Sequence, residues 1–366
     1  MPSFFRIEML PAKHGDALWI EYGTDARTRR ILIDGGPLPA YADLSARLQK
    51  LPPGDQGVEL VVISHVDTDH IEGLIRLLAE PEADWPIAPQ EIWFNGWRHI
   101  EEAHTLGGRE GEFLSALIHR RANAIWNTSF DGEAVCTGKL EDETIELADG
   151  MRLTLVSPDP EALAKLRDDW KDSVDNWEIE PGDLDAAWDQ LVETNKFHPD
   201  AELTLGPEDL TARLLSQLKG RDGSTANGSS IAFIAEFDDK SCLFLADAHA
   251  KVVCDSLRRL GYTRDDPLRV DAMKMSHHGS KNNITRELLE LVDTRNYLFS
   301  TNGDKFKHPD KAAVEAVIAG SRRRPTLWFN YLSEFNREWK ERAREAGAGF
   351  DARFPRQGRA GIVLEL

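Results

Sequence analysis

The fold of this chain is decided by one stretch, Val61-Val62-Ile63-Ser64-His65-Val66-Asp67-Thr68-Asp69-His70-Ile71-Glu72-Gly73-Leu74. An apolar segment typical of a buried strand ends at Ser64, and two imidazoles and two carboxylates follow within six residues, before a helix-like segment begins. Such a cluster would repel itself if it were buried without a counter-charge. Because imidazoles and carboxylates are preferred ligands of divalent first-row cations, the H-x-D-x-D-H pattern predicts a metal site at a strand end rather than a polar surface loop.

Three other apolar segments also end in side chains that bind metals. The first ends in Asp34, the second in Asp247, and the third in the imidazole pair His277 and His278. Taken alone, an Asp at the end of a strand is commonly a turn or cap residue. Taken together with the first motif, these strand ends predict that distant segments supply the remaining ligands of a site for two metal ions.

Strand-like and helix-like segments recur along the chain in two strand-rich halves. The first half runs to about residue 94, and similar strands return between residues 152 and 366. This order predicts an α/β protein in which two packed sheets carry helices on both outer faces, a four-layer αββα sandwich. We expect a single domain over residues 1–366, interrupted by helical insertions at about 97–127 and 158–219.

The charge of the chain is strongly acidic, with 63 Asp and Glu against 44 Lys and Arg and a net charge of −19 over 366 residues. Nonspecific adhesion to a polyanion is therefore disfavoured, although a local basic patch or a bound metal can still receive a phosphate. Within residues 161–210, 15 acidic residues stand against 4 basic ones. This acidic insertion is either a solvated helical face or a contact surface for a protein partner.

A second charged region, residues 321–360, carries ten basic and five acidic residues with interleaved aromatic side chains. It is either a surface for nucleic acid or phosphate, centred on Arg322, Arg323 and Arg324, or a terminal amphipathic helix. The three cysteines form no C-x-x-C pair, which suits a reducing compartment. Because no leader-like segment opens the chain and no apolar run approaches ~20 residues, we expect a cytoplasmic protein without membrane contact.

Several of these segments resemble the metallo-β-lactamase superfamily and, more narrowly, the C-terminal hydrolase domain of the DNA-uptake competence protein ComEC and its free-standing relatives. The resemblance covers most of the chain and follows the family's order through residues 9–17, 32–36, 65–70, 227–230, 246–247, 277–280 and 308–309. It implies the αββα fold with two divalent metal ions, zinc or manganese. Asp67 distinguishes the motif from that of true β-lactamases, so antibiotic hydrolysis is not expected.

The resemblance also implies roles for the metal-type side chains. It places His65 and Asp67 on one metal, Asp69 and His70 on the other, and Asp247 between the two. One imidazole of the 277/278 pair would complete the second metal site, and His277 is preferred because it comes first after the strand. Asp34 would support the ligands from behind by fixing either an imidazole tautomer or the loop that carries the ligands.

One departure from the superfamily concerns the first metal. An additional His is often supplied between the main motif and the bridging Asp, and no clear equivalent stands here. The resemblance to the ComEC-like group implies that an Asn-x-x-Ser element, here Asn227 and Ser230, occupies this part of the site and contacts substrate. The first metal is therefore expected to be bound more weakly than the second.

The implied chemistry is hydrolysis of a phosphodiester, DNA among them, by a metal-activated water, with Asp69 and Asp247 taking part as ligands. His308 would act as a leaving-group acid or as a hydrogen-bond donor to phosphate, and Lys281 would touch phosphate. His14 and Asp16 either line the site or shape the turn around Gly15. Two alternatives are a hydrolase of small phosphoesters or cyclic nucleotides, and a non-catalytic interaction component of a multi-protein system such as phage defence.

Overall fold

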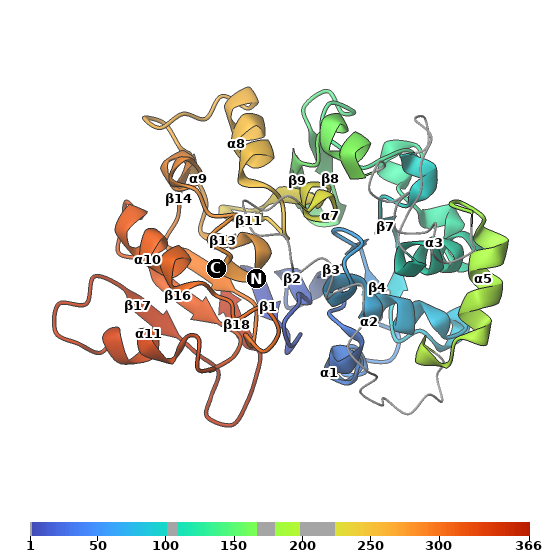
Figure 1. The fold of residues 1–366 in the computed structure, drawn as a ribbon, viewed down its shortest axis with the longest axis horizontal. Coiled ribbons are helices and arrows are strands. Elements are labelled where there is room, and N and C mark those ends of the chain that lie inside the picture. The colour runs from blue at the N-terminus through green and yellow to red at the C-terminus, as the bar shows by residue number, and fades with distance from the viewer. Residues whose placement is uncertain (1, 101–108, 167–179, 198–223) are drawn as a thin grey trace.

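Two sheets lie face to face at the centre of the protein (Figure 1). The computed structural model describes residues 2–100, 109–166, 180–197 and 224–366. The first sheet has six strands in the order β18-β1-β2-β3-β5-β7, with bounds β18 Ile362–Glu365, β1 Ser3–Met9, β2 Leu18–Thr24, β3 Arg27–Ile33, β5 Leu60–Val62 and β7 Ile92–Trp93. Its first four strands pair antiparallel, and β3, β5 and β7 run parallel.

The second sheet has eight strands in the order β17-β16-β15-β13-β11-β10-β9-β8. Their bounds are β17 Asp351–Arg353, β16 Thr326–Phe329, β15 Asn296–Phe299, β13 Ala272–Lys274, β11 Lys240–Phe244, β10 Ala232–Phe237, β9 Arg152–Ser157 and β8 Thr144–Glu146. The strands from β11 to β17 are parallel, whereas β8 to β11 are antiparallel. Two short parallel pairs complete the strands: β4 Gly57–Val58 with β6 Ala88–Pro89, and β12 Leu268–Arg269 with β14 Val292–Asp293.

Helices cover the outer face of each sheet because alternate strand residues point to opposite faces. In β1 and β2, Phe5, Ile7, Leu18 and Ile20 face the second sheet, and their cluster continues through Phe233 and other residues of β9, β10 and β11. The described α-helices include α1 Tyr41–Leu48, α2 Thr68–Ala79, α3 Arg109–Arg121, α5 Leu184–Glu193, α7 Thr225–Gly228, α8 Ala250–Arg259, α9 Arg286–Leu291, α10 Lys311–Gly320 and α11 Arg337–Arg342. The 3₁₀ turns are η1 Leu38–Ala40, η2 Glu82–Asp84, η3 Trp97–His99, η4 Asn123–Ile125, η5 Thr128–Phe130, η6 Ala148–Gly150, η7 Asn195–Phe197 and η8 Ser276–Gly279.

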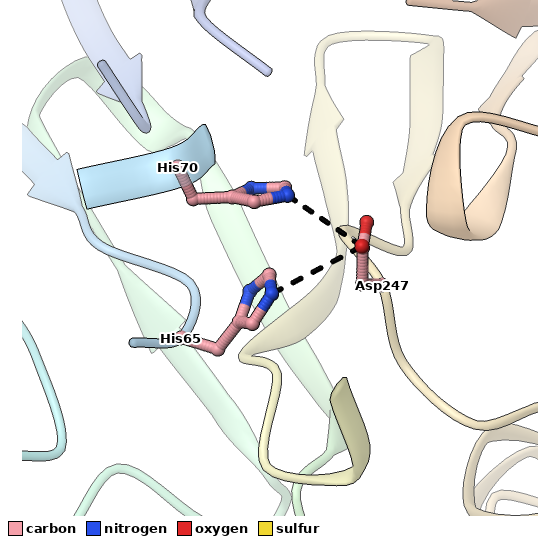
Figure 2. A group of neighbouring side chains, drawn as sticks. All are labelled: His65, His70 and Asp247. Atoms are coloured by element: carbon pink, nitrogen blue, oxygen red, sulfur yellow. Dashed lines mark ion pairs between the residues drawn. The ribbon is translucent and has the colours of Figure 1, made fainter. Parts of the chain in front are cut away.

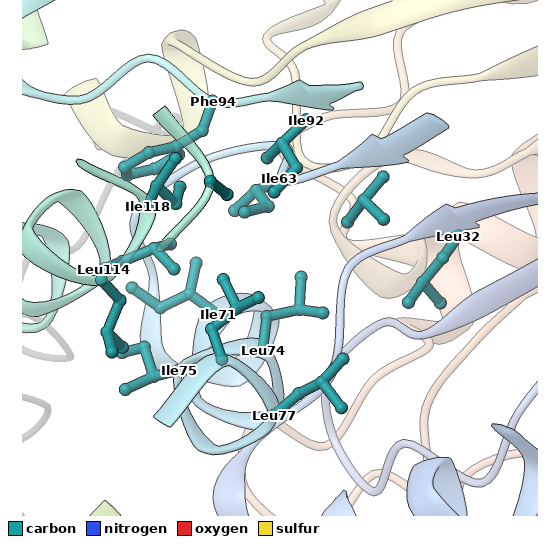
Figure 3. Close-up of a cluster of buried hydrophobic side chains, with 14 of the residues drawn as sticks. Leu32, Ile63, Ile71, Leu74, Ile75, Leu77, Ile92, Phe94, Leu114 and Ile118 are labelled. Carbon is teal, nitrogen blue, oxygen red and sulfur yellow. The ribbon is translucent and has the colours of Figure 1, made fainter. Parts of the chain in front are cut away.

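Each outer layer has its own apolar core. Helices α1, α2 and α3 pack against the first sheet, where Ile71, Leu74 and Ile75 of α2 share one apolar cluster with Leu32 and Ile63 (Figure 3). Helix α5 packs on α3. Helices α8, α9, α10 and α11 pack against the second sheet around Met273, Tyr297, Phe299 and Leu327. The predicted four-layer αββα sandwich is thereby confirmed.

The two predicted insertions are described only in part. Residues 97–127 contain η3, α3 and η4, while residues 101–108 lie outside the described ranges. Of residues 158–219, α5 and η7 are described, and residues 167–179 and 198–219 lie outside. Among the described helices, none has the length and apolar character to cross a bilayer.

Candidate metal centre

The carboxyl ends of the central parallel strands of both sheets meet at one edge of the sandwich. Hydrogen bonds join the two sheets at this edge, from Ile231 N, directly before β10, to Ser64 O at 2.9 Å and from Ser300 Oγ, directly after β15, to Gly15 O at 3.1 Å. Loops that follow the strands of an α/β sheet commonly bear its ligand sites. The metal-type side chains at these strand ends therefore lie together at this edge.

The main motif spans the end of β5 and the first turn of α2. His65 lies in the loop, Asp67 precedes the helix at its cap position, and Asp69 and His70 belong to the first helical turn. Asp69 is favoured there because the free N–H groups of a helix start attract negative charge. The side chains of His65, Asp69 and His70 are buried, whereas that of Asp67 is 34% exposed.

Glycines allow the chain to approach α2 closely. A β-carbon on Gly73 would lie 2.1 Å from Gly35 O, and one on Gly15 would lie 1.8 Å from Asp69 O, so neither position accepts a side chain without movement. The amide of Gly35 also donates to His70 O at 2.8 Å. These contacts bring the loops after β1 and β3, which carry Asp16 and Asp34, against the motif.

The second sheet supplies Asp247 after β11 and the imidazole pair after β13. Figure 2 shows Asp247 facing His65 and His70 across the gap between the two sheets. Asp247 Oδ2 lies 4.0 Å from His65 Nε2 and 3.5 Å from His70 Nε2. Candidate ligand atoms of His65, His70 and Asp247 lie within 4.8 Å of one another, as do those of Asp69, His70 and His278.

The two imidazoles of the pair lie in different surroundings. His278 is buried, and its Nε2 lies 3.4 Å from Asp69 Oδ2 and 3.7 Å from Asp247 Oδ2. His277 is 21% exposed, and its Nε2 lies 3.8 Å from Asp247 Oδ2. The imidazole beside Asp69 and His70 is thus His278, whereas the sequence favoured His277. Both residues have positive φ, 47° and 54°, so the backbone of η8 is left-handed at both imidazoles.

Asp34 fixes the tautomers of two imidazoles at once. Its Oδ2 accepts from His70 Nδ1 at 2.8 Å and from Ser64 Oγ at 2.7 Å. Because the Ser64 hydroxyl donates its hydrogen bond to Asp34, its oxygen accepts from His65 Nδ1 at 2.9 Å. His278 Nδ1 is held in the same way by Ser300 O at 2.9 Å. With Nδ1 engaged in this way, Nε2 of all three imidazoles faces the centre, and a cation bound there would take the place of any proton on Nε2.

Lys274 and Asp16 form a buried ion pair beneath His278. Both are almost fully buried, Lys274 Nζ lies 2.6 Å from Asp16 Oδ2, and Asp16 Oδ1 lies 3.4 Å from His278 Nδ1. Of the two sequence interpretations of Asp16, this contact favours a place in the site. Lys274 was not singled out from the sequence, although a lysine between Met273 and Met275 in a buried strand is a signal of a buried partner.

The buried carboxylates of the centre require positive charge nearby. Burial alone would raise the pKa of Asp247, but the neighbouring His278, His70 and His277 hold it well below its usual value. The pKa of Asp69 is lowered in the same way despite its burial. Burial opposes a charge on His278 as well, yet Asp247 and Asp16 raise its pKa to about 10. Four buried carboxylates, those of Asp16, Asp34, Asp69 and Asp247, face one buried ammonium, that of Lys274.

The donor set fits divalent cations. Two donors on one tetrahedral ion with bonds of ~2.0–2.1 Å lie about 3.3 Å apart, close to the 3.4–3.7 Å that separates His70 and His278 from Asp69 and Asp247. Within the described part of the chain, Nε2 of His65, His70 and His278 has no hydrogen-bond partner. Asp69, His70, His278 and Asp247 could hold one cation, and His65, Asp67 and Asp247 another. Imidazole with carboxylate suits both zinc and manganese.

A row of rings borders this centre. The His277 ring lies 5.4 Å from that of His308, which stacks at 6.1 Å on Phe306, whose edge meets His14 at 5.8 Å. Burial lowers the pKa of His14 and of His308 to about 4 each, and for His308 the charge of His277 acts in the same direction. Both imidazoles are therefore neutral at pH 7.

The remaining predicted site residues lie around the same centre. Asn227 Nδ2 lies 3.2 Å from His277 Nδ1, and Ser230 is buried beside the strand end at Ser64. Lys281 is exposed, and its backbone N–H donates to Asp310 Oδ2 at 2.9 Å, the carboxylate that also lies 3.7 Å from His308 Nδ1.

The arginines 322–324 belong to the other edge of the second sheet, before the amino end of β16. Arg323 pairs with Asp293 at 2.8 Å, Arg324 pairs with Asp351 at 3.0 Å, and Arg322 donates to the backbone of Arg264 and Glu290. These residues hold loops together on the edge opposite to the metal centre.

The sequence matches no family model and no curated protein. Among solved structures, it is similar to the metallo-β-lactamase fold protein YhfI from Bacillus subtilis, with 10% identity over 100% of both chains and a TM-score of 0.43. A diphosphatase from the PhnP family matches with 11% identity over 99% of this chain and 98% of that chain, TM-score 0.37. Zinc-bound PqqB from Methylobacterium extorquens matches with 12% identity over 95% and 87%, TM-score 0.38. These likenesses are distant, and the architecture given above rests on the sheets and helices of this chain itself.

Proposed function

We propose that this protein is a metal-dependent hydrolase of the metallo-β-lactamase superfamily, of the ComEC-like kind, and that it cleaves phosphodiesters with a metal-activated water. The observation that supports this most is the convergence of His65, His70 and His278, from opposite halves of the chain, on the buried carboxylates of Asp69 and Asp247. Burial of such charged side chains costs free energy of folding unless bound cations compensate their charge.

Divalent cations bound there would lower the pKa of a bound water and neutralise charge on a phosphoryl oxygen. The chain's own residues then have distinct tasks. Asp34 and Ser300 O keep the Nδ1 protons of His70 and His278 in place, so that Nε2 remains a donor atom. Lys274 fixes the charge and position of Asp16 behind His278.

His308 serves the leaving-group side of this proposal. Its ring lies beside His277, and its Nδ1 has no hydrogen-bond partner among the described residues. Since its pKa of about 4 leaves a neutral imidazole at pH 7, the ring carries one N–H. That N–H can donate a hydrogen bond to a phosphoryl or leaving-group oxygen.

One experiment tests the proposal directly. Metal content of the purified protein is measured by elemental analysis, together with hydrolysis of bis-p-nitrophenyl phosphate, for wild type, Asp67→Ala and Asp247→Asn. Wild type should carry a divalent cation and hydrolyse the diester, and Asp247→Asn should lose metal and more than about a hundredfold in activity, since even groups behind a ligand contribute 10- to 100-fold.

The matched control is Glu112→Gln, which replaces a buried carboxyl group on α3 outside the candidate metal groups. It should keep both metal and activity. Equal activity in wild type, Asp67→Ala and Asp247→Asn would refute the assignment of this centre as the site of hydrolysis.

A further inference from the structure

The lysines of this acidic chain are distributed unevenly with respect to their partners. Most lysines in the described ranges pair with a carboxylate, namely Lys139, Lys165, Lys196, Lys240, Lys251, Lys274 and Lys311. Those of the described ranges that form no ion pair are Lys13, Lys50, Lys281, Lys305, Lys307 and Lys340. Four of these six, Lys13, Lys281, Lys305 and Lys307, lie on loops that border the metal centre.

Three loops carry these four lysines. Lys13 belongs to the loop that also holds His14 and Asp16, and its backbone oxygen accepts from Asn302 N at 2.7 Å. Lys281 follows η8 and shares Asp310 with His308. Lys305 and Lys307 flank Phe306 on the loop after β15, directly before His308. Lys281, Lys305 and Lys307 are exposed and Lys13 is half-buried.

The acidic side chains of the last loop do not neutralise these lysines directly. Asp304 Oδ2 accepts from Asn302 Nδ2 at 2.6 Å, and Asp310 Oδ2 accepts from the backbone N–H of Lys281. In a chain of net charge −19, lysines left without carboxylate partners around one opening create a local attraction for anions.

Phe306 is the second independent feature of this rim. It is half-buried and belongs to none of the three hydrophobic clusters formed by the described residues, so its ring is not a core side chain. It is surrounded instead by His14, His277 and His308, at ring distances of 5.8, 6.5 and 6.1 Å, and by Lys305 Nζ, 5.1 Å from its centroid. His277 Nε2 lies in turn 3.8 Å from Asp247 Oδ2, so the His277 ring connects Phe306 to the centre.

Cationic side chains along a track and an aromatic ring among them are the two elements that bind single-stranded nucleic acid. The lysines contact phosphates, and the ring stacks on a base, which a duplex does not release without unstacking. A small phosphoester would need neither several separate lysines nor an aromatic ring beside the centre.

We propose that Lys13, Lys281, Lys305 and Lys307 together with Phe306 form a subsite for single-stranded nucleic acid, with a base stacked on Phe306 and neighbouring phosphates held by the lysines. This inference rests on the proposed function, because it assigns the substrate class of the same centre. It also transfers the expected nucleic-acid surface from the arginines 322–324 to the rim of the centre.

The first test neutralises the rim. Lys305→Gln/Lys307→Gln is compared with Lys50→Gln/Lys340→Gln, which removes the same charge from lysines after α1 and on α11. Hydrolysis of a 5′-fluorescein-labelled dT12 strand and of bis-p-nitrophenyl phosphate is measured over a range of salt concentrations. The rim variant should lose about tenfold in kcat/KM on the strand at low salt, and its salt slope should fall by about 1.4, since each lost phosphate contact on a single strand contributes ~0.7.

The same variant should hydrolyse bis-p-nitrophenyl phosphate within about twofold of wild type, and the control variant should match wild type on both substrates. Equal losses in rim and control variants, or no loss in either, would overturn the subsite. An equal rim effect on a dT12·dA12 duplex would do so as well, because it would indicate a double-stranded ligand.

The second test isolates the aromatic ring. Phe306→Ala should reduce kcat/KM on dT12 about tenfold, as expected for loss of one base stack, and should leave an abasic strand of the same length unaffected. Phe306→Trp should retain activity on dT12. If Phe306→Ala acts equally on both strands, stacking on Phe306 is refuted.

Failure of the proposed function would be distinguishable from failure of the subsite. If wild type hydrolyses no diester, the labelled strand stays intact, and its dissociation constant is measured by fluorescence anisotropy with the same variants. Rim-dependent binding without hydrolysis would retain the subsite and refute the hydrolase. Hydrolysis of bis-p-nitrophenyl phosphate without any rim effect on dT12 would retain the hydrolase and refute the subsite.

Discussion

Two buried acidic regions of this protein respond to burial in opposite ways. At the metal centre, imidazole charges outweigh the effect of burial and hold the pKa of Asp69 and Asp247 below its usual value. On α3, burial and the neighbouring charge of Asp183 raise the pKa of Glu112 to about 7, and the Gly182 N–H opposes this only in part. The first region stays ionised and suits a cation, whereas the second takes up a proton. Burial of a carboxylate alone therefore does not indicate a metal site, whereas buried carboxylates with neighbouring imidazoles do.

The largest effect should come from removing the cationic partner of Asp16, so that this carboxylate, like Glu112, is buried without an ammonium beside it. Lys274→Met removes the ammonium 2.6 Å from the Asp16 carboxylate and leaves a buried charge without its partner. Breaking such a pair costs about 3–5 kcal/mol of unfolding free energy, to be measured by chemical denaturation. The double variant Lys274→Met/Asp16→Asn should recover most of this loss. A single variant as stable as wild type would show that the pair does not stabilise the fold.

Removal of divalent cations should destabilise the metal centre and not the region around Glu112. With a cation at about a thousand times its dissociation constant, the folded state gains roughly 4 kcal/mol that a chelator removes. Thermal unfolding with and without EDTA measures this difference. In Asp247→Asn the difference should disappear, and in Glu112→Gln it should persist. An unchanged melting temperature of wild type in EDTA would contradict a bound cation.

A smaller effect is expected from substitution of Asp34, which accepts hydrogen bonds behind the imidazoles and is not itself a candidate ligand in the proposed arrangement. Asp34→Asn retains a side chain of similar size but loses the carboxylate that accepts from His70 Nδ1 and Ser64 Oγ. Metal affinity should fall about 10- to 100-fold, measured by competition with a chromogenic chelator. Because this readout concerns the imidazole tautomers, a variant that folds normally and binds metal like wild type would exclude the positioning role of Asp34.

The smallest effect concerns the pH dependence of Glu112. Its folded pKa of about 7 lies above the value in the unfolded chain, so its contribution to stability is complete below about pH 4.5 and is lost as the pH rises through 7. Glu112→Gln should remove this loss and gain about 2 kcal/mol relative to wild type between pH 5 and pH 8. Denaturation curves at both pH values test this. Parallel pH profiles of the two proteins would show that Glu112 titrates normally.

The sequence predicted the first half of the centre because its residues are contiguous. His65, Asp67, Asp69 and His70 fall within six positions between a strand and a helix, and the structure places them where that pattern implies. Asp247 and the imidazole pair were found because each follows an apolar strand, and parallel strands that end at one edge bring such residues together. The αββα layers followed from the same alternation of strands and helices.

Other features depend on geometry that no local pattern encodes. The sequence does not indicate that His278 rather than His277 lies beside Asp69, because both follow the same strand and both have left-handed backbone in η8. The role of Lys274 depends on its ion pair with Asp16, which lies more than 250 positions away in the chain. The proposed cationic rim likewise depends on which lysines form ion pairs, and the sequence does not give these pairs. The composition indicated a basic region at residues 321–360 instead.

The strand β18 has a consequence for biosynthesis. It completes the edge of a sheet whose other strands all come from the first 93 residues, by pairing with β1 from Arg6 to Met9 (Figure 1). On the ribosome, the outer edge of β1 remains without its neighbour until residues 362–365 have emerged. Exposed edges of this kind can pair with other chains. A nascent polypeptide of this protein would therefore benefit from chaperone protection until β18 has been synthesised and has paired with β1.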